Sequence, residues 1–431
     1  KAETWRGSVT HELWLAARED TPLAAHSTNG PRVQNCRAAQ NLGTRLAHAE
    51  APQKIRSSAP PPVPTGVWQL AWPTVLTNLL QSTVALTDVK VVGTLGAAAV
   101  AAATTGHRVF FALQAVLMGV SVGTSALVAR AWGANERAEA ARVLNSSLIL
   151  AGLISLAMSI LGVGLAGTFA GVFGLAPEAR ALAAIYMRWI SAFTCVFAFG
   201  LVLSSALRAA GDTRTPLFIG AIANLMNIFF LYLVVFGGLG APKLGIAGAA
   251  LAGGLAFCVA GGAQLWLWRS GRLRLRSVPA DAKQRERMRA ILHVGTPAAL
   301  EQLVVQAGFI AFTFIIARFF GTPALAAYGI GVQILSLSFV IGFGFSIAAS
   351  TCVGQNLGAG DAVRAAHSGW RAMWLAVASM SVLAVLIVSC AEPIARMMLD
   401  EPEVVRLTVA FIRLLGVAQP LMAVDFALGG A

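Results

Sequence analysis

Three carboxylates interrupt long apolar stretches of the chain, at Asp88, Glu301 and Asp425. An ionised side chain inside a lipid bilayer costs about 3 kcal/mol or more, so it persists there only where it is paired, hydrated or used. Such a carboxylate can take up and release a proton, and its oxygens are the ligands that hard cations prefer. We interpret Asp88 as a proton-binding group, and Glu301 with Asp425 as possible ligands of Na⁺.

The other reactive side chains do not suggest enzyme chemistry. Five cysteines stand far apart without the spacing of a metal site, and the histidines of the apolar part are scattered at His107, His293 and His367. No phosphate-binding Walker sequence is present. We therefore expect no catalytic residue and no cofactor other than a coupling ion.

The composition is that of a membrane protein. Hydrophobic residues make up 57% of the chain and charged residues 12%, with a mean hydropathy of +0.72, which is outside the range of soluble domains. Apolar runs of about 18 residues or more recur from Val67 onward, each long enough to cross the hydrocarbon layer as a helix. The runs are continuous rather than alternating, which argues against membrane strands. The sequence predicts an all-α polytopic fold with ten spans, at roughly 68–94, 98–131, 143–167, 180–207, 215–237, 246–268, 291–319, 324–354, 370–391 and 405–431.

A strongly basic segment at residues 269–289 separates the sixth and seventh spans. Dense Lys and Arg between apolar helices is typical of a cytoplasmic connection, because positive loops resist translocation. Counting back six spans also places the N-terminus in the cytoplasm, and the other loops agree, since Arg130, Arg137, Arg142, Arg208 and Arg214 fall on the same side. The net charge of +13 is therefore a matter of topology, and we expect the lipid bilayer and no nucleic acid as a partner.

Residues 1–66 differ from the rest. They are polar, end in a proline-rich run and contain no apolar core of a secretory signal. We interpret them as a disordered tail or as sequence wrongly assigned upstream of the protein.

The membrane part contains an internal repeat. A shift of 225 positions places Gly96, Gly106, Ser121 and Gly133 on glycines and a serine of the second half, and Pro177-Glu178 on Pro402-Glu403. Halves joined by an even number of spans have the same orientation, so these are parallel repeats, an organisation typical of transporters. The first half continues past the point that matches Ala431, so we expect about 60 further residues with two spans that this chain lacks.

Several motifs together resemble the multidrug and toxic compound extrusion (MATE) antiporters. The first span reads Trp68-x4-Pro73-x14-Asp88-x4-Gly93, and the segment Leu207-Arg208-Ala209-Ala210-Gly211-Asp212-Thr213-Arg214-Thr215-Pro216 is similar to the most recognisable loop of that family. The turns Gly133-Ala134-Asn135 and Gly358-Ala359-Gly360-Asp361 and the pair Asn224-x2-Asn227 match it as well. The resemblance covers about residues 68–431.

The resemblance implies two six-helix lobes that export organic cations from the cell in exchange for H⁺ or Na⁺. It assigns residues 67–268 to the N-lobe, 269–290 to a basic cytoplasmic linker and 291–431 to four of the six helices of the C-lobe. We expect a multi-pass protein of the inner membrane, working as a monomer.

The resemblance also implies site residues, which are Asp88 with Asn224 and Asn227 in the first lobe, and Glu301 with Gln306 and Asp425 in the second. The family often has an aspartate one turn after Asn227, where this chain has Leu231. Lys90, two residues after Asp88, is unusual for the family, and an alternative is that Asp88 simply pairs with it near the membrane surface.

Three other hypotheses remain open. A flippase of lipid-linked or amphipathic anions would need a cavity ringed by arginine, and the spans hold only Arg108, Arg188, Arg318 and Arg413. An integral membrane enzyme would need clustered acid, base or nucleophile groups. The histidines of the apolar part are instead scattered along the sequence. A chain lacking two spans would be inactive in transport.

Overall fold

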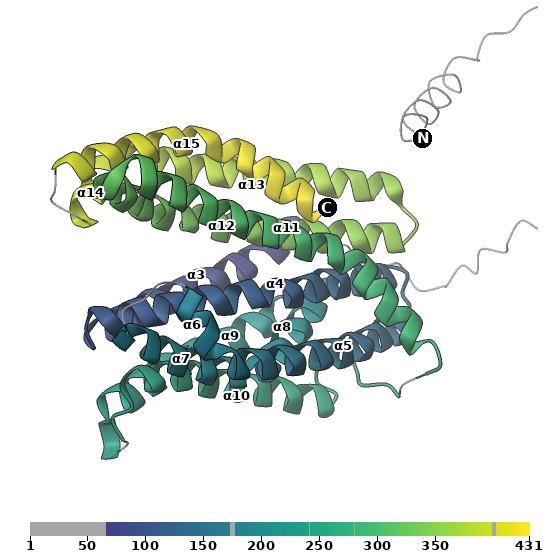
Figure 1. Cartoon of the computed structure of the whole chain (residues 1–431). Coiled ribbons are helices and arrows are strands. Elements are labelled where there is room, and N and C mark those ends of the chain that lie inside the picture. Colours follow the sequence, from purple (N-terminus) through teal and green to yellow (C-terminus); the bar gives the residue numbers. More distant parts are fainter. Residues whose placement is uncertain (1–65, 173–176, 241, 280, 399–401) are drawn as a thin grey trace, which may run out of the picture. The chain divides into compact units, whose positions relative to one another are not determined.

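A computed structural model describes residues 66–172, 177–240, 242–279, 281–398 and 402–431 (Figure 1). Nearly all of these residues are helical, and none of them forms a strand. The predicted tail, apart from Gly66, lies outside the described residues.

The helices fall into two runs along the chain. The first helix group comprises α3 (Val67–Gly93), α4 (Ala97–Gly133), α5 (Arg137–Gly164), α6 (Ala166–Val172), α7 (Pro177–Ala192), α8 (Thr194–Ala209), α9 (Arg214–Phe236), the 3₁₀ turn η1 (Gly238–Gly240) and α10 (Gly245–Arg269). The second helix group comprises α11 (Gln284–Phe319), α12 (Gly321–Gly358), α13 (Ala362–Ser389), α14 (Ala391–Met398) and α15 (Pro402–Gly430).

Eight of these helices are long and apolar enough to cross a membrane within the described ranges, or nine if the bent pair α7 and α8 is counted as one span. This confirms the all-α polytopic class. The first predicted span, at 68–94, corresponds to α3, which is not among these candidates. It is 27 residues long but contains Gln, Asn and Thr side chains as well as Asp88 and Lys90. The parallel six-helix repeat and the two further spans remain predictions.

Several helices extend beyond the apolar runs from which they were predicted. α5 begins at Arg137 rather than near 143, and α13 begins at Ala362 rather than near 370. α11 begins at Gln284, so its first turns occupy the end of the segment assigned to the basic linker. A helix satisfies its backbone hydrogen bonds internally in water as well as in lipid, so the boundary of the apolar run does not stop it.

The span predicted at 180–207 is bent rather than straight. α7 ends at Ala192 and α8 begins at Thr194, with an angle of 49° between them. Phe193 lies at the break, and its ring fills the space beside Gly254 of α10. A Cβ at Gly254 would collide with that ring, so the glycine permits the bend to pack against α10.

Two short turns reverse the chain after α4 and α12. Asn135 and Gly360 both have a positive φ, of 61° and 77°. In each turn the next residue donates its backbone N–H to a carbonyl five residues earlier, Glu136 to Ala131 at 2.9 Å and Asp361 to Asn356 at 3.0 Å. These left-handed C-caps are the conformation that glycine and asparagine tolerate best. The turn motifs recognised in the sequence are therefore helix C-caps of the same geometry.

α3 packs against helices of both groups, one at each of its ends. Its beginning, at Val67, Leu70 and Ala71, belongs to a buried cluster with residues of α12, α13 and α15. Its end, at Val91, belongs to a cluster with α9 and α10. Asp88 lies at this second end, and α9 is the neighbour that its helix packs against there.

Candidate functional site

Asp88 of α3 and Asn227 of α9 lie together. Both side chains are half-buried, and the Asn227 side chain forms a hydrogen bond with the Asp88 carboxylate. Oδ1 of Asp88 and Oδ1 of Asn227 are buried and have no hydrogen-bond partner among the described residues. Buried acceptors without a donor are costly, and a proton or another cation would satisfy them. The pair is therefore a chemically suitable place to bind a small cation.

Leu231 holds the helices of this pair together. It lies one turn beyond Asn227, is fully buried, and packs with Val91, Val235 and Ala252. Val91 is in turn three residues beyond Asp88 on α3. The resemblance would lead us to expect an aspartate at position 231. In this chain Leu231 instead forms an apolar contact between α3 and α9. The first helix group offers a single carboxylate here.

Tyr186 of α7 is a third group near the pair, which the sequence did not single out. It lies close enough to Asp88 for the charge of the carboxylate to act on its phenol. Its ring is seated against Gly106 of α4, where an added Cβ would lie 2.5 Å from Cδ1 of the ring. The only signal in the sequence was rarity, since the chain has 3 tyrosines.

Lys90 does not accompany Asp88. It lies exposed in the last turn of α3, and no ion pair joins the two residues in the part of the chain that the structure describes. A cation in the last turn of a helix is favoured by the helix dipole. The alternative in which Asp88 merely pairs with Lys90 finds no support in this geometry. Asn224 is half-buried on α9, one turn before Asn227.

The predicted acids of the second helix group are placed differently. Glu301 is exposed on α11, four residues after Pro297, with Gln306 half-buried a little over one turn further along. Asp425 is exposed on α15. α11 packs mainly on α4, whereas α15 packs on α12 and α13. No three His, Cys, Asp or Glu side chains converge as in a metal site within the described ranges. A sodium site formed by Glu301 and Asp425 remains a prediction.

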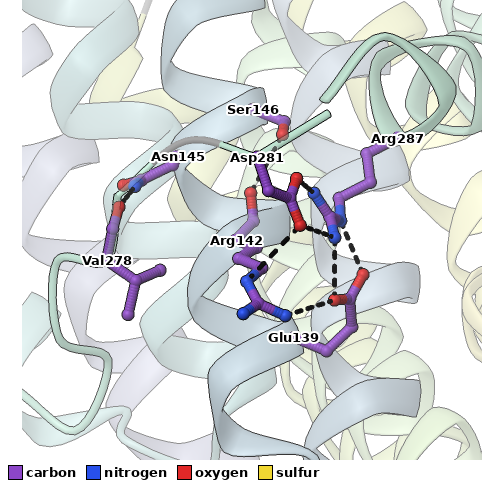
Figure 2. Close-up of polar contacts among 7 residues, drawn as sticks. All are labelled: Glu139, Arg142, Asn145, Ser146, Val278, Asp281 and Arg287. Atoms are coloured by element: carbon purple, nitrogen blue, oxygen red, sulfur yellow. Dashed lines mark hydrogen bonds and ion pairs between the residues drawn. The ribbon is translucent and has the colours of Figure 1, made fainter. Parts of the chain in front are cut away.

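An ion network that the sequence did not predict joins the linker to the first helix group (Figure 2). Arg287, near the start of α11, donates two hydrogen bonds to Glu139 of α5, at 2.6 and 2.9 Å. It also donates two to Asp281 of the linker, one of them at 2.9 Å. Arg142 lies 3.7 Å from Glu139 and 3.6 Å from Asp281. The side chain of Arg287 is only 9% exposed, so this is a nearly enclosed guanidinium with two carboxylates.

The network lowers the pKa of Asp281. The main cause is the hydrogen bond from Arg287, and the positive charges of Arg287 and Arg142 act in the same direction. Asn145 of α5 adds a hydrogen bond from its side-chain amide to the carbonyl of Val278 (Figure 2). The end of the linker is therefore attached to α5 at two places.

The two helix groups contact each other closely through glycines. A Cβ added to Gly119 of α4 would lie 2.5 Å from the carbonyl oxygen of Gly295 of α11. At the end of α4, Gly133 touches the backbone of Gln355 of α12, and Gly358 touches that of Arg130. Small residues permit this approach of two backbones between membrane helices.

A hydrogen bond accompanies these contacts. Nε2 of Gln355 donates to the carbonyl of Ala209, at the end of α8, over 2.8 Å. The contacts of Gly119 and Gly133, the bond from Gln355 and the network of Arg287 all lie towards the ends of helices that the charge pattern assigns to the cytoplasm. The groups are thus in close contact on that side.

Comparison with known proteins gives a consistent result. The family model described as MatE matches residues 73–233 and 297–431. The chain is 30% identical over 373 residues to a probable multidrug resistance protein NorM of Thermotoga maritima, a match that covers 84% of this chain and 78% of that protein.

Solved structures share the fold. A transporter of the MOP superfamily from Pyrococcus furiosus matches with a TM-score of 0.75 and 23% identity, covering 84% of this chain and 82% of that one. A mutant of a Vibrio cholerae MATE transporter matches with a TM-score of 0.76 and 22% identity, covering 84% and 83%.

Proposed function

Because the chain belongs to the MATE family, whose members are multidrug efflux transporters, we propose that it exports organic cations from the cell in exchange for H⁺ or Na⁺. The observation that supports this is the pair Asp88 and Asn227. A single carboxylate on a membrane helix shares a hydrogen bond with an amide, and each side chain keeps one buried oxygen unpartnered within the described ranges. One cation bound between them would satisfy both oxygens.

Exchange follows if two cations compete for this carboxylate. A bound proton or sodium ion removes the negative charge that attracts an organic cation, so the coupling ion would displace the drug on one side of the membrane. On the other side the ion would dissociate and the drug would bind again. A carboxylate that never changes its ligand would bind drug without coupling it to an ion gradient.

Movement between the two sides would be a rocking of the two helix groups against each other. The close contacts at Gly119 and Gly295 and at Gly133 and Gln355 lie on the side that the charge pattern assigns to the cytoplasm. They would have to separate for the site to open to the cytoplasm. The ion network of Arg287 with Glu139 and Asp281 lies on the same side and would hold the closed state.

The test is accumulation of a cationic dye in cells that express the full chain. We expect lower steady-state dye in these cells than in cells with an empty vector, and we expect the difference to vanish when a protonophore and Na⁺-free medium are applied together. A chain that reaches the membrane but leaves dye accumulation unchanged for a panel of organic cations would contradict the proposal.

A further inference from the structure

The linker after α10 has a regular alternation of charge and burial. Arg272, Arg274 and Arg276 are exposed, whereas Leu273 and Leu275 between them are 6% and 1% exposed. The two leucines belong to the main apolar cluster of the first helix group. The chain therefore crosses the bundle surface as an irregular, bent segment, with its leucines inserted and its arginines exposed. We call Arg269, Arg272, Arg274 and Arg276 the arginine strip.

The strip is fixed to the bundle at further points. Arg274 donates a hydrogen bond to the carbonyl of Ala210 over 3.3 Å. Further along, Val278 accepts the hydrogen bond from Asn145, and Asp281 joins the ion network of Arg287 (Figure 2). A basic linker with so many attachments presents its charges at defined positions.

The strip begins where a membrane span ends. α10 is one of the candidate spans, and its last residue is Arg269. Trp266, in the last turn, is 58% exposed, and the guanidinium of Arg272 lies over its ring at 4.8 Å. Exposed tryptophan at the end of a membrane helix is typical of the headgroup region. Because Arg272 forms a cation–π contact with Trp266, the strip lies at the depth of the lipid headgroups.

The charges of the strip are not neutralised by the protein. The segment 269–280 contains no acidic residue. The next acid, Asp281, forms ion pairs with Arg287 and Arg142 instead. None of the four arginines forms an ion pair within the ranges that the structure describes. Four fixed cations beside a membrane surface attract anionic lipid, and the attraction falls off within a Debye length of that surface.

We propose that the arginine strip binds the anionic headgroups of the adjacent lipid leaflet, with phosphatidylglycerol as a representative lipid. This interaction concerns the outside of the bundle, and it does not depend on the exported substrate or on the coupling ion.

The test uses the full chain reconstituted in phosphatidylcholine with a spin-labelled lipid, and it measures the association constant of labelled phosphatidylglycerol relative to labelled phosphatidylcholine. We expect a preference for phosphatidylglycerol. The double variant Arg272→Gln with Arg276→Gln should lower it by up to about 25-fold, since each arginine near a charged surface contributes about fivefold. The matched control removes two exposed cations elsewhere, with Lys243→Gln and Arg371→Gln, and should leave the preference unchanged.

A second variant separates the position of the charges from their number. Leu273→Ser with Leu275→Ser keeps every arginine but removes the apolar attachment of the strip to the bundle, and it should lower the preference as well. The melting temperature of each variant in detergent shows that the bundle is still folded. Absence of any preference in the wild type would overturn the proposal, and so would an equal loss in the matched control or a full preference in the serine variant.

Discussion

Gly119 of α4 and Gly295 of α11 meet backbone to backbone. A Cβ on Gly119 would lie 2.5 Å from the Gly295 carbonyl oxygen and 2.8 Å from Cβ of Ala299. The two residues belong to different helix groups and are separated by more than 170 positions in the sequence. Nothing larger than hydrogen fits between these helices in the present arrangement, so the glycines determine how closely the groups can approach.

Substitution of Gly119 by alanine should force α4 and α11 apart. Overpacking at such a contact typically costs about 1–3 kcal/mol, and here the cost falls on the state in which the groups touch. We expect increased labelling of a cysteine introduced near the contact by a membrane-impermeant thiol reagent added from the cytoplasmic side, and slower transport. Gly152→Ala on α5 is the matched control, because a Cβ at Gly152 has no neighbour within 4 Å. Equal labelling of both variants would show that the contact does not limit opening.

Replacement of Arg287 by glutamine should loosen the end of the linker. The change removes the charge-assisted hydrogen bonds to Glu139 and Asp281 and should lower the stability of this region by about 2 kcal/mol. The measurement is hydrogen exchange of the backbone amides at 281–287. Arg289→Gln removes an exposed arginine from the same helix and serves as the control. The assignment fails if both variants exchange at the same rate as the wild type.

The attachment of the linker should depend on pH in the acid range. The pKa of Asp281 is lowered in the folded protein, mainly by the hydrogen bond from Arg287. The stabilisation of the linker by the ionised Asp281 is therefore complete above the pKa of an unfolded aspartate, about 3.9. It is lost as the pH falls through the lower pKa that Asp281 has in the folded protein. Hydrogen exchange at 281–287 should be constant from about pH 5 to 8, after correction for intrinsic rates, and should accelerate below about pH 4. Asp281→Asn should weaken this transition and leave the part due to Glu139, whose pKa is also lowered by the hydrogen bond from Arg287. A transition centred near pH 6 would point to another group.

Leu231 should be necessary for the geometry around Asp88. Leu231→Ala removes buried contacts with Val91 and Val235 and typically costs about 2–5 kcal/mol, whereas the volume-conserving Leu231→Met costs less than about 1.5 kcal/mol. We expect a lower melting temperature and reduced transport for the alanine variant alone. If the alanine variant transports normally, the packing of α3 on α9 does not position Asp88.

The sequence was sufficient for the fold class because long apolar runs have few alternatives to membrane helices. It also indicated Asp88, because a carboxylate inside such a run stands out, and it indicated Asn227 through the family resemblance. The bend at Phe193 could not be predicted, because no proline or glycine interrupts the helix there. Helix starts were misplaced wherever a polar first turn precedes the apolar run, as at Arg137 and Gln284.

Contacts between distant parts of the chain were beyond sequence reasoning. Glu139 and Arg287 are 148 residues apart, and each is an ordinary charged residue at the start of a helix. Tyr186 lies near Asp88 with its ring seated against Gly106, a contact between α7 and α4 that neither helix reveals alone. Helical periodicity describes the faces of one helix and says nothing of which helix will cover them.

The central claim is that Asp88 couples the export of organic cations to an ion gradient. The most direct measurement is uptake of a cationic dye into proteoliposomes containing the full chain, driven by an imposed pH gradient or, separately, by a Na⁺ gradient. Asp88→Asn is compared with the wild type after the melting temperatures of both have been shown to agree. We predict gradient-driven uptake by the wild type and a loss of at least about tenfold in the variant, since the amide can neither bind the coupling ion by charge nor attract the dye. Uptake by Asp88→Asn at the rate of the wild type would contradict the account.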